Sequence, residues 1–253
     1  MTIDRVAATG FQAGADAYER ARPGYPPDAV GWLLDRLQIE PGSRVVDLGA
    51  GTGKLTASLV DAGAHVVAVE PVEAMRSHLA GALPGFTIVA GTAEAIPLAP
   101  GVMDSVVAAQ AFHWFDAARS LSEIHRVLAP AGRLGLMWNA RDRSKAWVEA
   151  MSEIVDAYGD AIRRHETGGW RSAFPAPGFG TLEERVFSNV QRIPPDGIVD
   201  RVASTSFIAR LPDEERADVL ERIRGLVRTH PETRGKDLID FPHLTRVYWC
   251  ERI

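Results

Sequence analysis

The segment from Arg44 to Leu55 constrains the fold of this 253-residue chain more than any other. It reads RVVDLGAGTGKL, and HVVAVE follows it from His65 to Glu70. The apolar letters predict two buried strands, at residues 44–48 and 65–69, and the glycines predict a tight turn that opens a helix. A strand, a glycine turn, a helix and a second strand build a nucleotide-type pocket at the strand ends.

The glycines of this turn give it its binding capacity. Gly49, Gly51 and Gly53 lack a Cβ, so the turn can adopt strained dihedral angles and a ligand can approach the backbone closely. The predicted helix over residues 54–62 begins here, and its N-terminus favours a carboxylate or a phosphate. Glu70 follows Gly49 by 21 residues, at the end of the second strand. A carboxylate in that place can accept both hydroxyls of a ribose.

The spacing of the glycines separates three cofactor classes. A dinucleotide fingerprint, G-x-G-x-x-G, requires glycine at position 54, where this chain has Lys54. A phosphate-binding loop, G-x-x-x-x-G-K-[ST], requires other residues than Leu48 and Leu55. The observed G-x-G-x-G after VVDL resembles motif I of class I S-adenosylmethionine (SAM)-dependent methyltransferases. The resemblance implies that the turn holds the methionine part of SAM and that Glu70 holds the ribose; the alternative is a turn without a ligand.

Two further segments match this family. The run GTAEAIPL after the third predicted strand resembles the segment that contacts adenine, with Thr92 where many relatives carry aspartate. The adenine amino group then has three candidate partners: Thr92, a backbone carbonyl, or Glu94, which has the alternative of a helix-start charge. Pro71 and Ala93 are expected to complete this side of the cofactor site. The notable departure from the family pattern is therefore at position 92.

The run AQAFHWFD after the fourth predicted strand resembles the corresponding motif of the methyltransferase type 11 group. By this resemblance the carbonyl of Gln110, next to Ala111, accepts a hydrogen bond from the SAM ammonium group. Asp47 would add a negative field there, and its alternative is a turn carboxylate that binds local N–H groups. Ala50, within the turn, is expected to contact the cofactor too.

His113 is the candidate catalytic base, because a neutral imidazole can take a proton near neutral pH. The alternative is that His113 and Trp114 wall the pocket and bind substrate or pack on SAM. A methyl group on a sulfonium is already reactive, so proximity and in-line alignment can carry the reaction without a base.

The N-terminal run YERARPGYP resembles the Y-x-x-x-R-P-x-Y-P of trans-aconitate-methyltransferase-like proteins. Arg22 is expected to clamp a carboxylate of SAM or of the substrate, and Tyr18 to cover the sulfonium by cation–π attraction. Tyr25 and Trp170 are expected to contact the substrate. The alternative is an arm that packs on the sheet.

Strands that alternate with helices predict an α/β fold with a parallel sheet covered on both faces. We expect a Rossmann-like, doubly wound, seven-stranded sheet, mostly parallel, with an antiparallel C-terminal edge hairpin that the resemblance implies, and a helical cap. The expected strands are residues 44–48, 65–69, 86–90, 105–109, 133–138, 182–193 and 244–250. Residues 1–253 should form a single domain, with an N-terminal helical arm at 1–40 and cap elements at 140–180 and 194–236 over the pocket.

Composition limits the other classes of function. The net charge of −5 argues against nucleic acid as the main partner. The single cysteine excludes an internal disulfide, and the histidines show no metal-ligand spacing, so we expect no metal. No apolar signal region opens the chain and no apolar stretch reaches 18 residues. We therefore expect a cytoplasmic protein that does not bind membranes and that acts on a small molecule; its oligomeric state stays open.

These observations predict a SAM-dependent methyltransferase with a small-molecule acceptor. Oxygen is the favoured nucleophile, and a carboxylate is one form of it that needs no base. The alternatives are an NAD(P)-dependent oxidoreductase and a protein that binds SAM without turnover.

Overall fold

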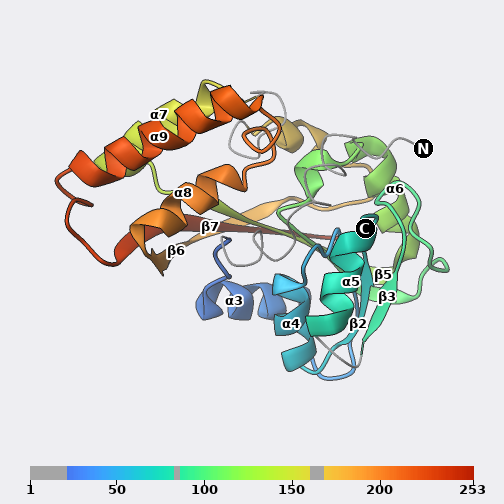
Figure 1. Cartoon of the computed structure of the whole chain (residues 1–253). Helices are drawn as coiled ribbons and strands as arrows, with labels where there is room; N and C mark the ends of the chain where they lie inside the picture. Colours follow the sequence, from blue (N-terminus) through green and yellow to red (C-terminus); the bar gives the residue numbers. More distant parts are fainter. Residues whose placement is uncertain (1–21, 83–85, 160–167) are drawn as a thin grey trace.

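A seven-stranded sheet forms the centre of the protein (Figure 1). The structure, a computed structural model, describes residues 22–82, 86–159 and 168–253. The strand order is β3-β2-β1-β4-β5-β7-β6. The strands are β1 (Arg44–Leu48), β2 (His65–Val69), β3 (Thr87–Val89), β4 (Met103–Ala109), β5 (Leu128–Arg141), β6 (Glu183–Ile193) and β7 (Ile239–Glu251). The first five strands pair in parallel, and β7 pairs antiparallel with both β5 and β6. The predicted fold class is thereby confirmed.

Helices cover both faces of the sheet, because the central strands are apolar on both sides. The helices are α3 (Pro27–Leu37), α4 (Lys54–Asp61), α5 (Glu73–Ala82), α6 (Ala117–Val127), α7 (Ala146–Asp156), α8 (Pro195–Ala203) and α9 (Asp213–Thr229), with the 3₁₀ turns η1 (Phe112–Trp114) and η4 (Gly169–Ala173). On one face, Leu33 of α3 and Leu59 of α4 belong to the same buried cluster as Met137. On the other face, Ile124 of α6 belongs to a cluster with Trp138.

Helices α7, α8 and α9 form a separate apolar cluster with the start of β7. Its buried side chains include Trp147 of α7, Ile198 of α8, Ile223 of α9 and Phe241 of β7. Figure 1 shows these helices gathered on the opposite side of the molecule from α3, α4 and α5. That the segments 140–180 and 194–236 act as a cap over a pocket stays a prediction.

Strands β5 and β7 are longer than the apolar segments from which they were predicted. Strand β5 begins at Leu128, directly after α6, although the sequence predicts that Pro130, Ala131 and Gly132 form a turn before a strand at 133–138. Ala131 still has a positive φ of 59°. The register from Arg133 opposite Glu251 to Arg141 opposite His243 is continuous, so backbone pairing extends both strands past their hydrophobic centres. The sequence also missed α8.

Candidate active site

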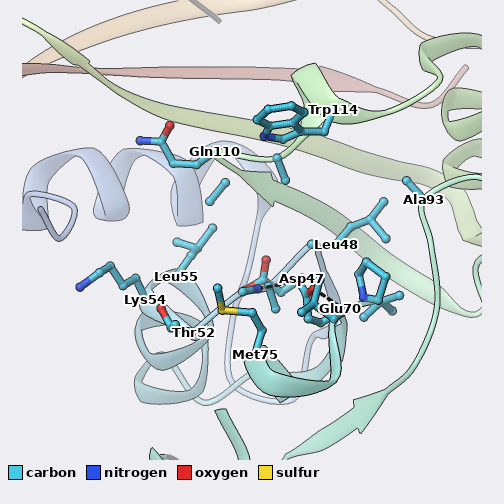
Figure 2. A pocket seen from close by; sticks show the side chains of 18 of the residues that line it. Asp47, Leu48, Thr52, Lys54, Leu55, Glu70, Met75, Ala93, Gln110 and Trp114 are labelled. Atoms are coloured by element: carbon cyan, nitrogen blue, oxygen red, sulfur yellow. Dashed lines mark hydrogen bonds between the residues drawn. The ribbon is translucent and has the colours of Figure 1, made fainter. Parts of the chain in front are cut away.

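A cavity lies at the carboxyl ends of β1, β2 and β4, where Figure 2 shows Gln110 and Trp114 on one side and Thr52, Glu70 and Met75 on the other. It collects most of the predicted binding residues. Those lining it are Arg22, Tyr25, Asp47, Gly49, Ala50, Gly51, Glu70, Pro71, Thr92, Ala93, Glu94, Gln110, Ala111 and Trp114. Tyr18 lies outside the described residues.

The glycine turn forms one wall of this cavity. Gly49 has a φ of 72°, and its N–H donates to the Val69 carbonyl over 2.8 Å. A Cβ on Gly49 would lie 2.8 Å from the Cβ of Ala111, so the position excludes a side chain. Gly51 also has a positive φ, 58°, but a Cβ there would meet only open space. Gly53, the N-cap of α4 with a φ of 92°, supports the turn without lining the cavity.

Glu70 ties the turn to the start of the next helix. Its two carboxylate oxygens accept the N–H of Gly51 over 2.9 Å and that of Val72 over 2.8 Å. The residue is only 5% exposed. Burial raises the pKa of Glu70, and the two backbone hydrogen bonds oppose that rise. The carboxylate is therefore fixed in place at the end of β2.

Asp47 is buried at the end of β1, with 1% of its surface exposed. Its Oδ2 accepts the hydroxyl of Thr56 over 2.6 Å, and its Oδ1 is buried with no hydrogen-bond partner. Burial raises the pKa of Asp47 to about 6; hydrogen bonding from Thr56 opposes the rise and the nearby charge of Glu70 adds to it. A buried acceptor without a partner is costly unless a ligand donates to it.

The segment after β3 forms the opposite end of the cavity. Thr92 pairs with Ala95 in an isolated bridge, and the Ala95 N–H donates to the Thr92 carbonyl over 3.2 Å. The Glu94 carboxylate accepts the N–H of Asp116 over 3.0 Å, and Asp116 is the N-cap of α6. Glu94 thus lines the cavity and also binds the backbone at the start of a helix, which agrees with its helix-start alternative.

The segment after β4 enters the cavity through a strained residue. Gln110 has a φ of 57°, and its N–H donates to the Met137 carbonyl over 2.8 Å. Its side-chain amide donates to the Asn139 carbonyl over 3.3 Å. These two bonds hold Gln110 against β5, and Trp114 lines the cavity four residues later.

Besides Gly53, two of the predicted residues that the structure describes do not line the cavity: His113 and Trp170. The indole N–H of Trp138 donates to Nδ1 of His113 over 3.1 Å. Trp170 is buried and stacks on Trp138, with 4.5 Å between the ring centroids. Trp170 therefore belongs to the core beside α6, and its contact with a substrate stays a prediction.

The segment from Arg22 to Tyr25, here called the strap, closes the cavity from the N-terminal side. Arg22, Pro23 and Tyr25 all line it. The guanidinium of Arg22 donates to the carbonyl of Ser204, at the C-terminus of α8, over 3.1 Å. A residue of the predicted 194–236 segment thus contacts a residue of the cavity wall.

Comparison with known proteins agrees with this arrangement. A family model described as a methyltransferase domain matches residues 46–136. An uncharacterized methyltransferase of Mycobacterium bovis is 42% identical over 235 residues, which cover 93% of this chain and 92% of the relative. The chain belongs to the class I methyltransferases.

Two more matches relate this methyltransferase to other members. A solved "Putative Type II Methyltransferase from Anaeromyxobacter dehalogenans" is 25% identical, has a TM-score of 0.72, and covers 91% of this chain and 97% of its own. The malonyl-[acyl-carrier protein] O-methyltransferase of Methylococcus capsulatus is 44% identical over 101 residues, 37% of this chain and 36% of that protein. The second likeness is confined to part of each protein.

Sequence reasoning missed part of the wall of the methyltransferase cavity. The further lining residues are Pro23, Leu48, Thr52, Lys54, Leu55, Val69, Val72, Met75, Gly91, Ala109 and Phe115. Leu48, Val69 and Ala109 end strands β1, β2 and β4, so the rule that ligands bind at strand ends would have found them. Met75 carried no such signal, because its spacing in α5 reads as core.

Two other features, a metal-ligand cluster and a membrane-spanning helix, are not found in the described part of the chain. In residues 22–82, 86–159 and 168–253, no three His, Cys, Asp or Glu side chains gather as metal ligands. None of the described helices is long and apolar enough to cross a bilayer.

Proposed function

We propose that this protein transfers the methyl group of SAM to a small-molecule acceptor. The observation that carries the proposal is the buried Oδ1 of Asp47, an acceptor without a protein partner at the cavity. The SAM ammonium group is a charged donor of matching size, and the Gln110 carbonyl is proposed as its second acceptor. A charge-assisted hydrogen bond would offset the burial of the carboxylate.

The remaining contacts follow from the lining. A carboxylate has about four lone-pair sites, so Glu70 can accept ribose hydroxyls besides its two backbone N–H groups. Gly49, Ala50 and Gly51 would approach the methionine part, and Gly53 supports their turn. Tyr18 is proposed, on the resemblance alone, to cover the sulfonium.

The adenine end would be closed by Pro71, Thr92 and Ala93, all of which line the cavity. Glu94 already accepts the Asp116 N–H through one oxygen, and its second oxygen is the one we assign to the adenine amino group. Thr92 and a backbone carbonyl are the competing assignments.

Bound SAM supplies a methyl carbon that is already activated by the sulfonium. In the proposed transfer, the acceptor oxygen would form the new bond to that carbon, the carbon–sulfur bond would break, and S-adenosylhomocysteine would leave with the electron pair. The residues of the chain then need only to align the two molecules and exclude water. Trp114 and Tyr25 are the proposed walls for the acceptor.

His113 is placed poorly for proton transfer. Because the Trp138 indole donates to Nδ1, the neutral imidazole carries its proton on Nε2 and has no second acceptor to offer. We therefore assign His113 to the wall and favour an acceptor that needs no base, such as a carboxylate. The likeness to an O-methyltransferase in part of the chain supports an oxygen acceptor.

Two cationic side chains of the lining support an anionic ligand: Arg22 of the strap and Lys54 at the start of α4. The methionyl carboxylate of SAM is the first candidate for such a group, and an acidic acceptor is the second. The net charge of −5 favours a small molecule over nucleic acid.

The direct test is titration calorimetry with S-adenosylhomocysteine, beside a titration with NADH. We expect binding of S-adenosylhomocysteine only; binding of NADH alone would favour the oxidoreductase and refute the proposal. Release of S-adenosylhomocysteine from SAM is then measured with a panel of carboxylic acids, phenols and amines. If no compound of a broad panel leads to release of S-adenosylhomocysteine, the alternative of a protein that binds SAM without turnover is favoured.

A further inference from the structure

Asn139 occupies a central place that no motif in the sequence marks. It lies on β5, is 8% exposed, and stands opposite Thr245 of β7 in the sheet register. Its Nδ2 donates to the carbonyl of Gly24 over 3.0 Å and, more weakly, to that of Pro23 over 3.4 Å. A side chain of the sheet thus holds the backbone of the strap.

The oxygen of the same amide is held equally firmly. Asn139 Oδ1 accepts the hydroxyl of Thr245 over 2.5 Å and the side-chain N–H of Asn189 over 3.1 Å. Asn189, on the edge strand β6, also donates to the Gly24 carbonyl over 2.9 Å. Both ends of the Asn139 amide are therefore satisfied, which fixes its orientation: the donors face the strap and the acceptor faces β6 and β7.

The strap and the cavity meet at this residue. The Asn139 main-chain carbonyl accepts the side chain of Gln110, which lines the cavity, while its side chain holds the segment that carries Arg22. Arg22 is held from its other side by the Ser204 carbonyl. Asn139 thus fixes the position of Arg22 relative to Gln110. Its bond to Gly24 joins two residues that are 115 positions apart in the sequence.

We propose that Asn139 is a positioning residue that sets the Arg22 guanidinium against the methionyl carboxylate of SAM, with Asn189 as its support on the edge strand. The proposal rests on the proposed function. A guanidinium binds a carboxylate through two parallel N–H donors, so a small displacement of the strap removes one of the two bonds. In the described residues, the Gly24 carbonyl accepts hydrogen bonds from the side-chain N–H groups of Asn139 and Asn189.

The test compares two ligands that differ in the methionyl part. S-adenosylhomocysteine has the amino-acid group, and 5′-deoxy-5′-methylthioadenosine has the same nucleoside and sulfur without it. We expect Arg22→Ala to weaken S-adenosylhomocysteine by roughly 10- to 150-fold, the equivalent of a charged hydrogen bond of about 1.5–3 kcal/mol. The Kd of methylthioadenosine should change by less than about two-fold.

Asn139→Asp is the central variant, because it keeps the acceptor for Thr245 and Asn189, replaces the donors to the strap, and sets a buried negative charge against the Gly24 carbonyl. We expect this variant to weaken the binding of S-adenosylhomocysteine about ten-fold and to leave the binding of methylthioadenosine unchanged. In the Arg22→Ala background the same change should add no further loss, since both act through one contact. Ser188→Asp, an exposed neighbour of Asn189 on β6, adds the same charge away from the strap and should have no effect.

Asn189→Ala removes one donor to Gly24 and provides a milder variant if Asn139→Asp fails to fold. We expect a loss of about three-fold, again for S-adenosylhomocysteine alone. Equal losses for both ligands, additive effects with Arg22→Ala, or unchanged affinity would each overturn the proposal. A wild-type protein that binds neither nucleoside would instead overturn the proposed function.

Discussion

The buried carboxylate of Asp47 should make donor binding depend on pH. Its pKa in the protein is about 6, raised mainly by burial. An ammonium group binds the ionised carboxylate and not the neutral acid, so binding should draw the proton off. At pH 7 about nine-tenths of the Asp47 side chains are ionised, and at pH 5 only about one-tenth. The Kd of S-adenosylhomocysteine should therefore rise about ten-fold as the pH falls from 7 to 5.

The assay is isothermal titration at pH 5, 6 and 7 in two buffers with different ionisation enthalpies. Near pH 6 we expect release of about half a proton per ligand bound. Asp47→Asn keeps an acceptor for Thr56 but cannot ionise, so its affinity should be lower and flat across this range. Glu70→Gln removes the neighbouring charge that adds to the raised pKa of Asp47, so the affinity should still fall toward pH 5, but by less than in the wild type.

The raised pKa of Asp47 also predicts that its ionised side chain destabilises the ligand-free protein. Because the folded pKa lies above the ordinary value of 3.8, ionised Asp47 opposes folding above pH 6, and this opposition fades as the pH falls toward 4. Two pKa units correspond to about 3 kcal/mol, so Asp47→Asn should raise the melting temperature at pH 7 while it weakens the ligand. The reasoning is refuted if wild-type affinity is the same at pH 5 and pH 7, or if Asp47→Asn shows the same pH dependence.

The remaining predictions concern the turn, the ribose contact and His113. Gly49→Ala should destabilise the fold by about 2–4 kcal/mol, because the new Cβ would meet Ala111. Gly51→Ala should destabilise it by only about 1 kcal/mol and should instead block ligand binding, because the new Cβ would point into open space. Thermal melts and ligand titrations separate the two effects, and equal melting temperatures for the two variants would contradict this prediction. Glu70→Ala should weaken both S-adenosylhomocysteine and methylthioadenosine about ten-fold, since both contain the ribose; a loss confined to one ligand would exclude the ribose assignment. His113→Phe should lower stability by about 1–3 kcal/mol in chemical denaturation, because the Trp138 indole loses its acceptor, and should leave the pH profile of turnover unchanged. Loss of the low-pH limb of that profile, where a base would be protonated, would restore His113 as the base.

The fold and the floor of the site were predictable because both follow from local sequence. Strands β1 and β2 are buried on both faces and therefore appear as unbroken apolar runs, with bounds that match the structure. The glycine turn and Glu70 lie within one strand–helix–strand unit, so their spacing carries their geometry. The predicted acid and the predicted turn meet in the hydrogen bond from Gly51 to Glu70.

The upper part of the site depends on contacts that no local pattern encodes. Trp170 reads as a ligand-facing aromatic, yet its place in the core depends on which face of the sheet η4 packs against. Asn139 interrupts the apolar run of β5 between Arg133 and Arg141, and its contacts with the strap appear only when β5, β6 and the strap meet. Side-chain spacing cannot predict such meetings between distant segments.

Strand β7 lies between β5 and β6, and the asparagines on those two flanking strands, Asn139 and Asn189, both bind the Gly24 carbonyl of the strap. The match to the methyltransferase family model ends at residue 136. Asn139, Asn189 and Thr245, whose side chains form the network that holds the strap, all lie beyond it. Exchanging the C-terminal segments of related methyltransferases should therefore change the affinity for the methyl donor, and not only the choice of acceptor.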